Sequence, residues 1–287
     1  MQSITKELPN AEFLDTQTIL DPAFQLGVNA RNAKCIVSNG KVVNMVSKSY
    51  GFISNDDFFG GFENVLEDEH INYTKEVTNY EDSRFTVDYL LDGQFQIGEE
   101  HKGKYSNDTL QPKIRLTHSF DGLVNTAGYF GFFRKICDNG LHVATTELAF
   151  KIKRTIGNTK IIFPAMKKMI EDYKANEMVT LVKTFQVLQE RKLNNIEIDL
   201  LLKDLSKDVF RYDISDKNEG KSKNILLVEE IIEREALALN QSPNAWLLYN
   251  AMNEVIYSNE RNKKNDGKRR DLDRLVFQRI ENEFCFN

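Results

Sequence analysis

The sequence has few of the residues that mark a disulfide-bonded or metal-binding protein. Its 287 residues include three cysteines and four histidines. Cys35, Cys137 and Cys285 form no CxxC pair, which argues against a disulfide framework and against a cysteine-rich zinc site. No two histidines lie three or four residues apart, the spacing that places two imidazoles on one helix face. We therefore expect free thiols, no metal site and no cofactor.

The sequence also lacks the features of membrane and secreted proteins. No run approaches the roughly 18 apolar residues that a membrane helix needs. The first residues carry neither a basic start nor an apolar signal core. These absences predict a cytoplasmic protein without a membrane partner. The 41% of hydrophobic residues is enough for a substantial core, and the length favours two domains.

Residues 33–155 are typical of antiparallel strands. Short segments rich in β-branched and aromatic residues are separated by Asn-Gly or Asp-Gly dipeptides, which tolerate the positive φ of tight turns. One helix is expected at residues 55–66, capped by Asn55 or Asp56, because phenylalanines recur there at helical spacing. We expect strands near 34–37, 41–46, 84–91, 113–117, 132–137 and 150–155, and turns at Asn39-Gly40, Asp92-Gly93, Asp121-Gly122 and Asn139-Gly140.

After Phe163 the hydrophobic period becomes helical. Helices are expected around residues 164–188, 198–209, 225–239, 246–256 and 271–284, with polar loops at 213–224 and 259–270. The predicted fold class is therefore α+β. An antiparallel β-sheet domain with a helix is expected at residues 1–162, followed by a mostly helical region at residues 163–287.

Charge is unevenly distributed along the chain, whose net charge is -5. Residues 55–108 contain 14 acidic and 4 basic residues, whereas residues 111–174 contain 5 acidic and 11 basic residues. In the segment 149–155, Phe150 and Ile152 alternate with Lys151 and Lys153, so a strand would direct two cations to solvent. The alternative is an ordinary solvated sheet face.

A basic ridge formed by neighbouring strands would suit a nucleic-acid backbone. Aromatic side chains at Tyr129, Phe130, Phe132 and Phe133 would supply stacking faces for unpaired bases, unless they belong to the core. The candidate nucleic-acid-binding residues are Lys113, Arg115, Arg134, Lys135, Lys151, Lys153, Arg154 and Lys160.

The segment FRKICDNGLH (residues 133–142) places a thiol, a carboxylate and an imidazole close together in sequence. Cys137 packs like a small hydrophobic residue unless a basic pocket activates it, and Asn139-Gly140 favours a hairpin turn. We interpret this segment as structural. No catalytic residue is assigned.

Two further patterns are weak. Gly98–Lys104 has the spacing of a phosphate-binding loop, but Tyr105 replaces the hydroxyl residue that holds magnesium. Asp92, with Glu100 and Lys102, has the residue types of a metal-dependent nuclease, but Asp92 more simply serves the turn with Gly93. A nuclease is therefore the third functional hypothesis.

Four ordered motifs resemble those of phage/plasmid-like proteins grouped as domain of unknown function nine-three-two. They are HSFDG at 118–122, RKICDNGL at 134–141, FKIKRT at 150–155 and NAWLLYNAMNE at 244–254. The resemblance extends from about Val42 to Phe277. It implies a mobile genetic element, and hence the cytoplasm of a bacterial host cell, but it supplies no activity.

A second resemblance involves the N-terminal part of the chain. Residues 41–51, the aromatic-rich helix after them, and a hairpin containing Ile114–Leu116, Asp121-Gly122 and Gly128–Gly131 are similar to the opening of Rad-fifty-two-type single-strand annealing domains. This similarity implies a protein that binds and anneals single strands.

These observations lead to two main hypotheses. The first is a non-enzymatic single-stranded DNA-binding or annealing protein that acts in replication or recombination, with single-stranded nucleic acid, copies of itself or a replication protein as partners. The second is an anti-defence module whose acidic segment 55–108 mimics DNA and binds a host-defence protein.

Overall fold

The computed structural model describes residues 8–19, 33–81, 83–98, 108–134, 140–141, 149–174, 178–210, 221–258 and 266–285. The chain divides into two compact units. The sheet unit comprises residues 1–92, 113–130 and 146–173, and the helical unit comprises residues 93–112, 131–145 and 174–287.

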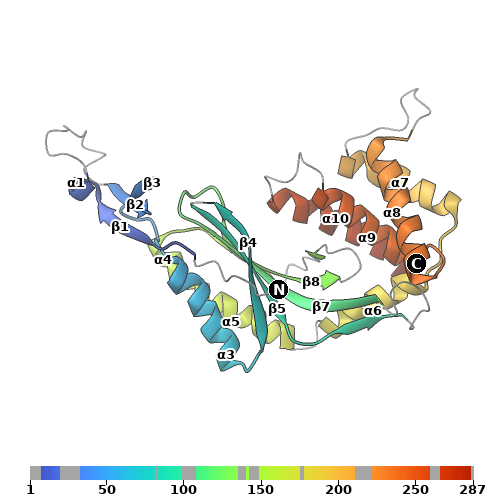
Figure 1. Ribbon diagram of the computed structural model, residues 1–287, viewed down its shortest axis with the longest axis horizontal. Helices are drawn as coiled ribbons and strands as arrows, with labels where there is room; N and C mark the ends of the chain where they lie inside the picture. The colour runs from blue at the N-terminus through green and yellow to red at the C-terminus, as the bar shows by residue number, and fades with distance from the viewer. Residues whose placement is uncertain are drawn as a thin grey trace. The chain divides into compact units, whose positions relative to one another are not determined.

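The sheet unit contains two antiparallel sheets (Figure 1). The smaller sheet has the strand order β1 (Ala11–Asp15), β2 (Ala33–Ser38) and β3 (Lys41–Ser47). Asn39 and Gly40, between β2 and β3, have φ angles of 51° and 72°, which confirms the expected tight turn.

The larger sheet has the order β10-β8-β7-β5-β4. Strands β7 and β8 contribute residues to both units, and the helical unit adds β6 beside β7 and β9 beside β8. The bounds are β4 (Tyr73–Glu81), β5 (Arg84–Leu91), β6 (Phe95–Ile97), β7 (Asp108–Ser119), β8 (Thr126–Arg134), β9 (Gly140–Leu141) and β10 (Ala149–Ile152).

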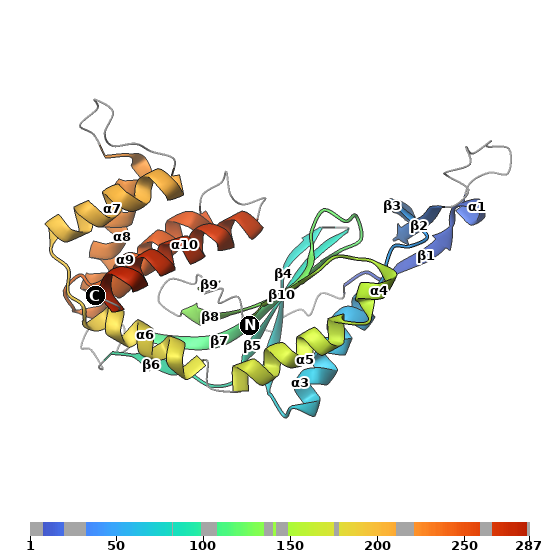
Figure 2. The same cartoon turned by 180° about the vertical axis from the view of Figure 1, so that it is seen from behind.

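Two helical segments cover one face of the sheet unit. The π-helical turn η1 (Asp56–Gly60) continues into α3 (Gly61–Asp68), which lies beside α5 (Ile162–Asp172) (Figures 1 and 2). Phe62 of α3 packs edge-on against Tyr89 of β5, with 5.0 Å between ring centroids. Burial of these rings stabilises the packing of α3 on the sheet.

The helical unit is organised around α9 (Ala245–Ser258). Residues 245–253 are all buried, so α9 contacts neighbours on every side. Its neighbours include α6 (Met178–Glu190), α8 (Lys223–Leu239) and α10 (Asp266–Cys285), and α7 (Asn195–Phe210) packs against α8 and α10.

The α+β fold class is confirmed. The predicted helix at 55–66 is also present, but Ser54 caps it: Ser54 Oγ accepts a hydrogen bond from the Asp57 amide, whereas Asn55 donates to the Pro9 carbonyl. β1 and the short helices α1 (Thr16–Ile19) and α4 (Ile156–Thr159) were not expected from the sequence.

The segment FRKICDNGLH forms part of an antiparallel pair. Phe133 of β8 pairs with Gly140 of β9, so Gly140 lies in a strand and not in the turn where the sequence placed it. Cys137, Asn139 and His142 lie outside the described residues.

Candidate nucleic-acid interface

The strand β10 directs Lys151 to solvent, as the alternation of the sequence predicted. Lys151 is exposed, whereas Ile152 is buried and Phe150 lies over Gly128 of β8. Lys153 and Lys160 are also exposed, and none of these three lysines forms an ion pair with another described residue. Their ammonium groups are therefore available to an anion in solution.

Hydrogen bonds hold the chain between these lysines in a defined shape. The strand ends at Ile152, earlier than expected, because Thr155 caps α4 by accepting a hydrogen bond from the Asn158 amide. Asn158 Nδ2 donates to the carbonyl of Lys153 at 2.8 Å. Tyr50 forms an isolated β-bridge with Thr155, which joins the segment to the residues that follow β3.

Arg154 points into the protein and not toward solvent. Its guanidinium donates to Tyr50 Oη at 2.7 Å, to Ser119 Oγ at 2.8 Å and to the Val124 carbonyl at 2.9 Å, and it also contacts the Ser119 carbonyl. Burial lowers the pKa of Arg154, although Tyr50 acts in the opposite direction. We therefore infer that Arg154 stabilises the turn between β7 and β8. The sequence had suggested that it contacts phosphate.

Lys113 and Arg115 also differ from the expected exposed ridge. Both lie on β7 beside Asp88 of β5, and Arg115 donates two hydrogen bonds of 2.6 and 2.7 Å to that carboxylate. Lys113 Nζ is buried 3.5 Å from Asp88 Oδ2. Burial raises the pKa of Asp88, but the two cations outweigh it and lower the pKa overall. These side chains neutralise an internal carboxylate.

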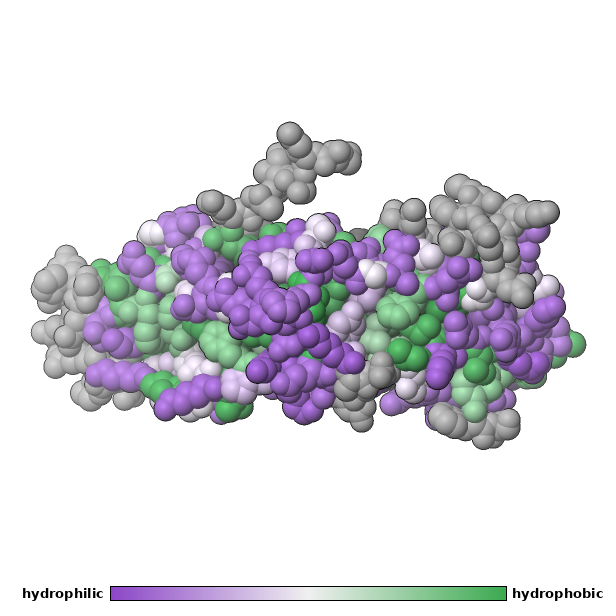
Figure 3. Space-filling model, turned by 90° about the horizontal axis from the view of Figure 1, so that it is seen from below, coloured by the Kyte–Doolittle hydropathy of each residue, from purple (hydrophilic) through white to green (hydrophobic). Residues whose placement is uncertain are grey.

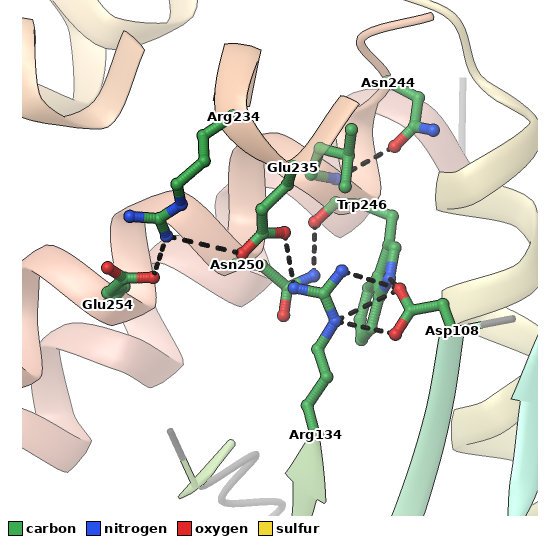
Figure 4. A network of polar contacts seen from close by, with 9 residues as sticks. Asp108, Arg134, Arg234, Glu235, Asn244, Trp246, Asn250 and Glu254 are labelled. Atoms are coloured by element: carbon green, nitrogen blue, oxygen red, sulfur yellow. Dashed lines mark hydrogen bonds and ion pairs between the residues drawn. The ribbon is translucent and has the colours of Figure 1, made fainter. Parts of the chain in front are cut away.

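Arg134 occupies the centre of a buried network in the helical unit (Figure 4). It donates to Asp108 Oδ1 at 2.9 Å and Oδ2 at 2.6 Å, and to Glu235 Oε2 of α8 at 2.5 Å. Trp246 Nε1 donates to the same Asp108 carboxylate at 2.7 Å. With no exposed surface, Arg134 cannot reach a phosphate unless this network opens.

The motif NAWLLYNAMNE explains how α9 supports that network. Asn244 Oδ1 accepts from the Leu247 amide and caps the helix, while Asn250 Nδ2 donates to the Trp246 carbonyl at 2.7 Å. The sequence marked the motif by its resemblance but did not reveal its partners. Asp108 and Glu235 lie 26 and 101 residues from Arg134 along the chain.

A second buried polar cluster joins α9 to α10. Asp273 of α10 has no exposed surface, and Tyr249 and Asn253 of α9 are its neighbours. Burial raises the pKa of Asp273 to about 7, although Asn253 and Tyr249 act in the opposite direction. The ionised form of this side chain is thus disfavoured in the folded protein.

The aromatic residues proposed for base stacking are mostly in the core. Phe130 and Phe132 have no exposed surface, Tyr129 is buried, and Phe133 is half-buried. Phe130 stacks on Tyr173, and Phe132 contacts Phe185 edge-on. The alternative interpretation, in which these rings belong to the core, describes them correctly.

The other patterns show no catalytic arrangement in the part of the chain that the structure describes. His118 is buried between the Ile53 carbonyl and the Thr126 hydroxyl, 3.1 and 3.2 Å away, and burial lowers its pKa well below the usual value. Among the described residues no group of three or more His, Cys, Asp or Glu side chains is placed to hold a metal. Lys135, Glu100 and Lys102 lie outside those residues.

No helix in the described ranges is long and apolar enough to cross a membrane.

The fold and its surfaces define an α+β protein with a lysine-bearing surface on the sheet unit and a buried ion network in the helical unit. Residues 42–276 match the family described as Domain of unknown function (DUF932), and the chain belongs to that family. No curated protein and no solved structure matches the chain significantly.

Proposed function

We propose that this protein is a non-enzymatic single-stranded DNA-binding or annealing protein of a phage or other mobile element, acting in replication or recombination in the cytoplasm of its host. The observation that carries the proposal is that Lys151, Lys153 and Lys160, which we call the lysine surface, are all exposed within one ten-residue segment. These three residues remain candidates for phosphate contacts, whereas Lys113, Arg115, Arg134 and Arg154 bind internal groups.

The geometry of the surface favours a phosphate backbone as its ligand. Three ammonium groups project from a segment that Thr155, Asn158 and the Tyr50 bridge hold in one conformation. Ordering such a segment on binding costs little conformational entropy because it is already ordered. The similarity to single-strand annealing domains supports the choice of single strands.

The first prediction concerns the salt dependence of binding. Three phosphate contacts predict that affinity for a short single strand falls about twentyfold between roughly 50 and 200 mM salt, because each contact releases part of a counterion. Lys151→Glu with Lys153→Glu should weaken binding and reduce this salt dependence. Fluorescence anisotropy with a labelled oligonucleotide at several salt concentrations measures both effects.

The matched control reverses two exposed lysines of the helical unit, Lys183→Glu with Lys203→Glu. This variant has the same net charge as the test variant, so a general effect of protein charge would weaken both equally. The proposal requires the control to bind like the wild type. Equal loss in both variants, or no binding of the wild type at low salt, would contradict it.

An acidic surface supports the second candidate function, an anti-defence module that binds a host protein. Asp56 and Asp57 of η1 and Glu67 and Asp68 of α3 are exposed on consecutive helical segments. On the face drawn in Figure 3, hydrophilic and apolar residues are interspersed.

The second prediction separates the two functions. Glu67→Lys with Asp68→Lys should abolish capture of a host protein by the immobilised chain if the acidic surface is the functional one. The same variant should bind single strands as well as the wild type or better if the lysine surface is functional. Loss of a captured protein together with unchanged strand affinity would favour the anti-defence function.

A further inference from the structure

An exposed aromatic ring lies next to Lys160. Phe163, in the first turn of α5, is 37% exposed, whereas Phe130 and Phe132 are fully buried. The ring rests against Gly61 of α3, where an added Cβ would overlap Cε1 of Phe163. The ring of Phe163 therefore packs directly on Gly61. More than a third of the residue remains exposed to solvent.

Two lysines stand at sequence spacings from Phe163 that place side chains on one face of a helix. Lys160 precedes Phe163 by three residues and Lys167 follows it by four, and residues at these spacings are neighbours on a helix surface. Lys160 and Ile161 lie in the turn between α4 and α5, and both have right-handed helical backbone angles, so we extend the spacing rule to Lys160. Both lysines are exposed, and neither forms an ion pair with another described residue.

We infer that Phe163 is a stacking platform for an unpaired base, with Lys160 and Lys167 contacting the phosphates on either side of that nucleotide. This inference rests on the proposed function and specifies its ligand. Seven helical residues span roughly 10 Å, a separation that two long lysine side chains can match to neighbouring phosphates. Stacking on an aromatic ring needs a base that is free of its duplex partner and neighbours.

The site therefore selects single strands over duplexes without selecting a base sequence, because every base has a π-face. It also supplies the aromatic contact that the buried rings of β8 cannot provide. Phe163 is exposed, its ring packs on Gly61, and Lys160 and Lys167 are near it in the sequence.

The test replaces the ring while keeping an apolar side chain on Gly61. Phe163→Leu should weaken binding of a single-stranded oligonucleotide about tenfold, the order found when one stacked base loses its aromatic partner. Phe163→Tyr, which keeps the ring, should bind like the wild type. An oligonucleotide with abasic sites should bind the wild type and Phe163→Leu equally, because it offers phosphates without bases.

A spectroscopic measurement tests stacking directly. An oligonucleotide carrying 2-aminopurine should lose fluorescence when it binds the wild type and lose less when it binds Phe163→Leu. Gly61→Ala should displace the ring of Phe163. It should then reduce the fluorescence loss as Phe163→Leu does, while circular dichroism shows a folded chain.

The outcomes separate this inference from the proposed function. If Phe163→Leu binds as tightly as the wild type while the Lys151 and Lys153 reversals weaken binding, the stacking platform is wrong and the proposed function stands. If the wild type binds duplex and single strand equally tightly, the inferred preference for single strands is wrong. If the wild type binds neither at low salt, both proposals fail.

Discussion

Replacing Arg134 by methionine is expected to lower the free energy of unfolding by about 3–5 kcal/mol. The substitution removes the cation that lies between Asp108 and Glu235 and leaves two carboxylates buried without it. Burial already raises the pKa of Glu235, although Arg134 opposes this effect, so loss of Arg134 makes the ionised form costlier still. Chemical denaturation followed by tryptophan fluorescence measures the change, because Trp246 is the only tryptophan and contacts the network.

Arg234, which precedes Glu235 in the sequence, provides a control. Arg234 pairs with Glu254 at 2.8 Å and lies 4.0 Å from Glu235 Oε1 at the edge of the network, but its side chain is 54% exposed. Arg234→Met should therefore cost less than about 1 kcal/mol, as is usual for a solvent-screened pair. Similar losses for Arg134→Met and Arg234→Met would show that the buried network contributes no more than a surface ion pair.

A triple variant tests whether the cost comes from unpaired charge. Arg134→Met combined with Asp108→Asn and Glu235→Gln removes all three charges and keeps similar side-chain volumes. It should be more stable than Arg134→Met alone, since no buried carboxylate then lacks a cation. If it is less stable, packing and not charge dominates the effect of Arg134.

Replacing Asp273 by asparagine is expected to stabilise the protein substantially more at pH 8 than at pH 5. The pKa of Asp273 is about 7 in the folded chain, above the usual value of 3.8. The folded state therefore holds this proton more tightly than the unfolded state. Its contribution to stability is greatest below pH 3.8 and is lost as pH rises through 7.

The pKa difference corresponds to a free energy of the order of 4 kcal/mol above pH 8. Asparagine resembles the protonated carboxyl group and does not ionise. The variant therefore does not lose this free energy of unfolding as pH rises. Urea denaturation at pH 5 and pH 8 measures the difference between variant and wild type at each pH. Comparing differences removes the contribution of other titrating groups that the two proteins share.

Asp271 provides the control for Asp273 on the same helix. Its side chain is 73% exposed, two residues before Asp273. Asp271→Asn should change stability by the same small amount at both pH values. An equal effect of Asp273→Asn at pH 5 and pH 8 would show that Asp273 is ionised in the folded protein throughout this range.

The sequence by itself determined the elements whose signals are local. Asn39-Gly40 predicted a hairpin turn because those two residue types tolerate positive φ, and the structure has positive φ at both. The period of apolar residues predicted the helices after Phe163 because the spacing of buried positions follows from helix geometry alone. The exposure of Lys151 beside buried Ile152 followed from strand alternation in the same way.

Only the tertiary structure decided which basic residues face solvent. Lys113, Arg115, Arg134 and Lys151 all belong to strands of one sheet, and nothing in their local sequence distinguishes them. The distinction depends on carboxylates elsewhere in the chain: Asp88 lies beside β7, and Asp108 and Glu235 enclose Arg134. A charged side chain remains buried only when such partners compensate its lost hydration, and pairing between distant residues follows from the packed fold.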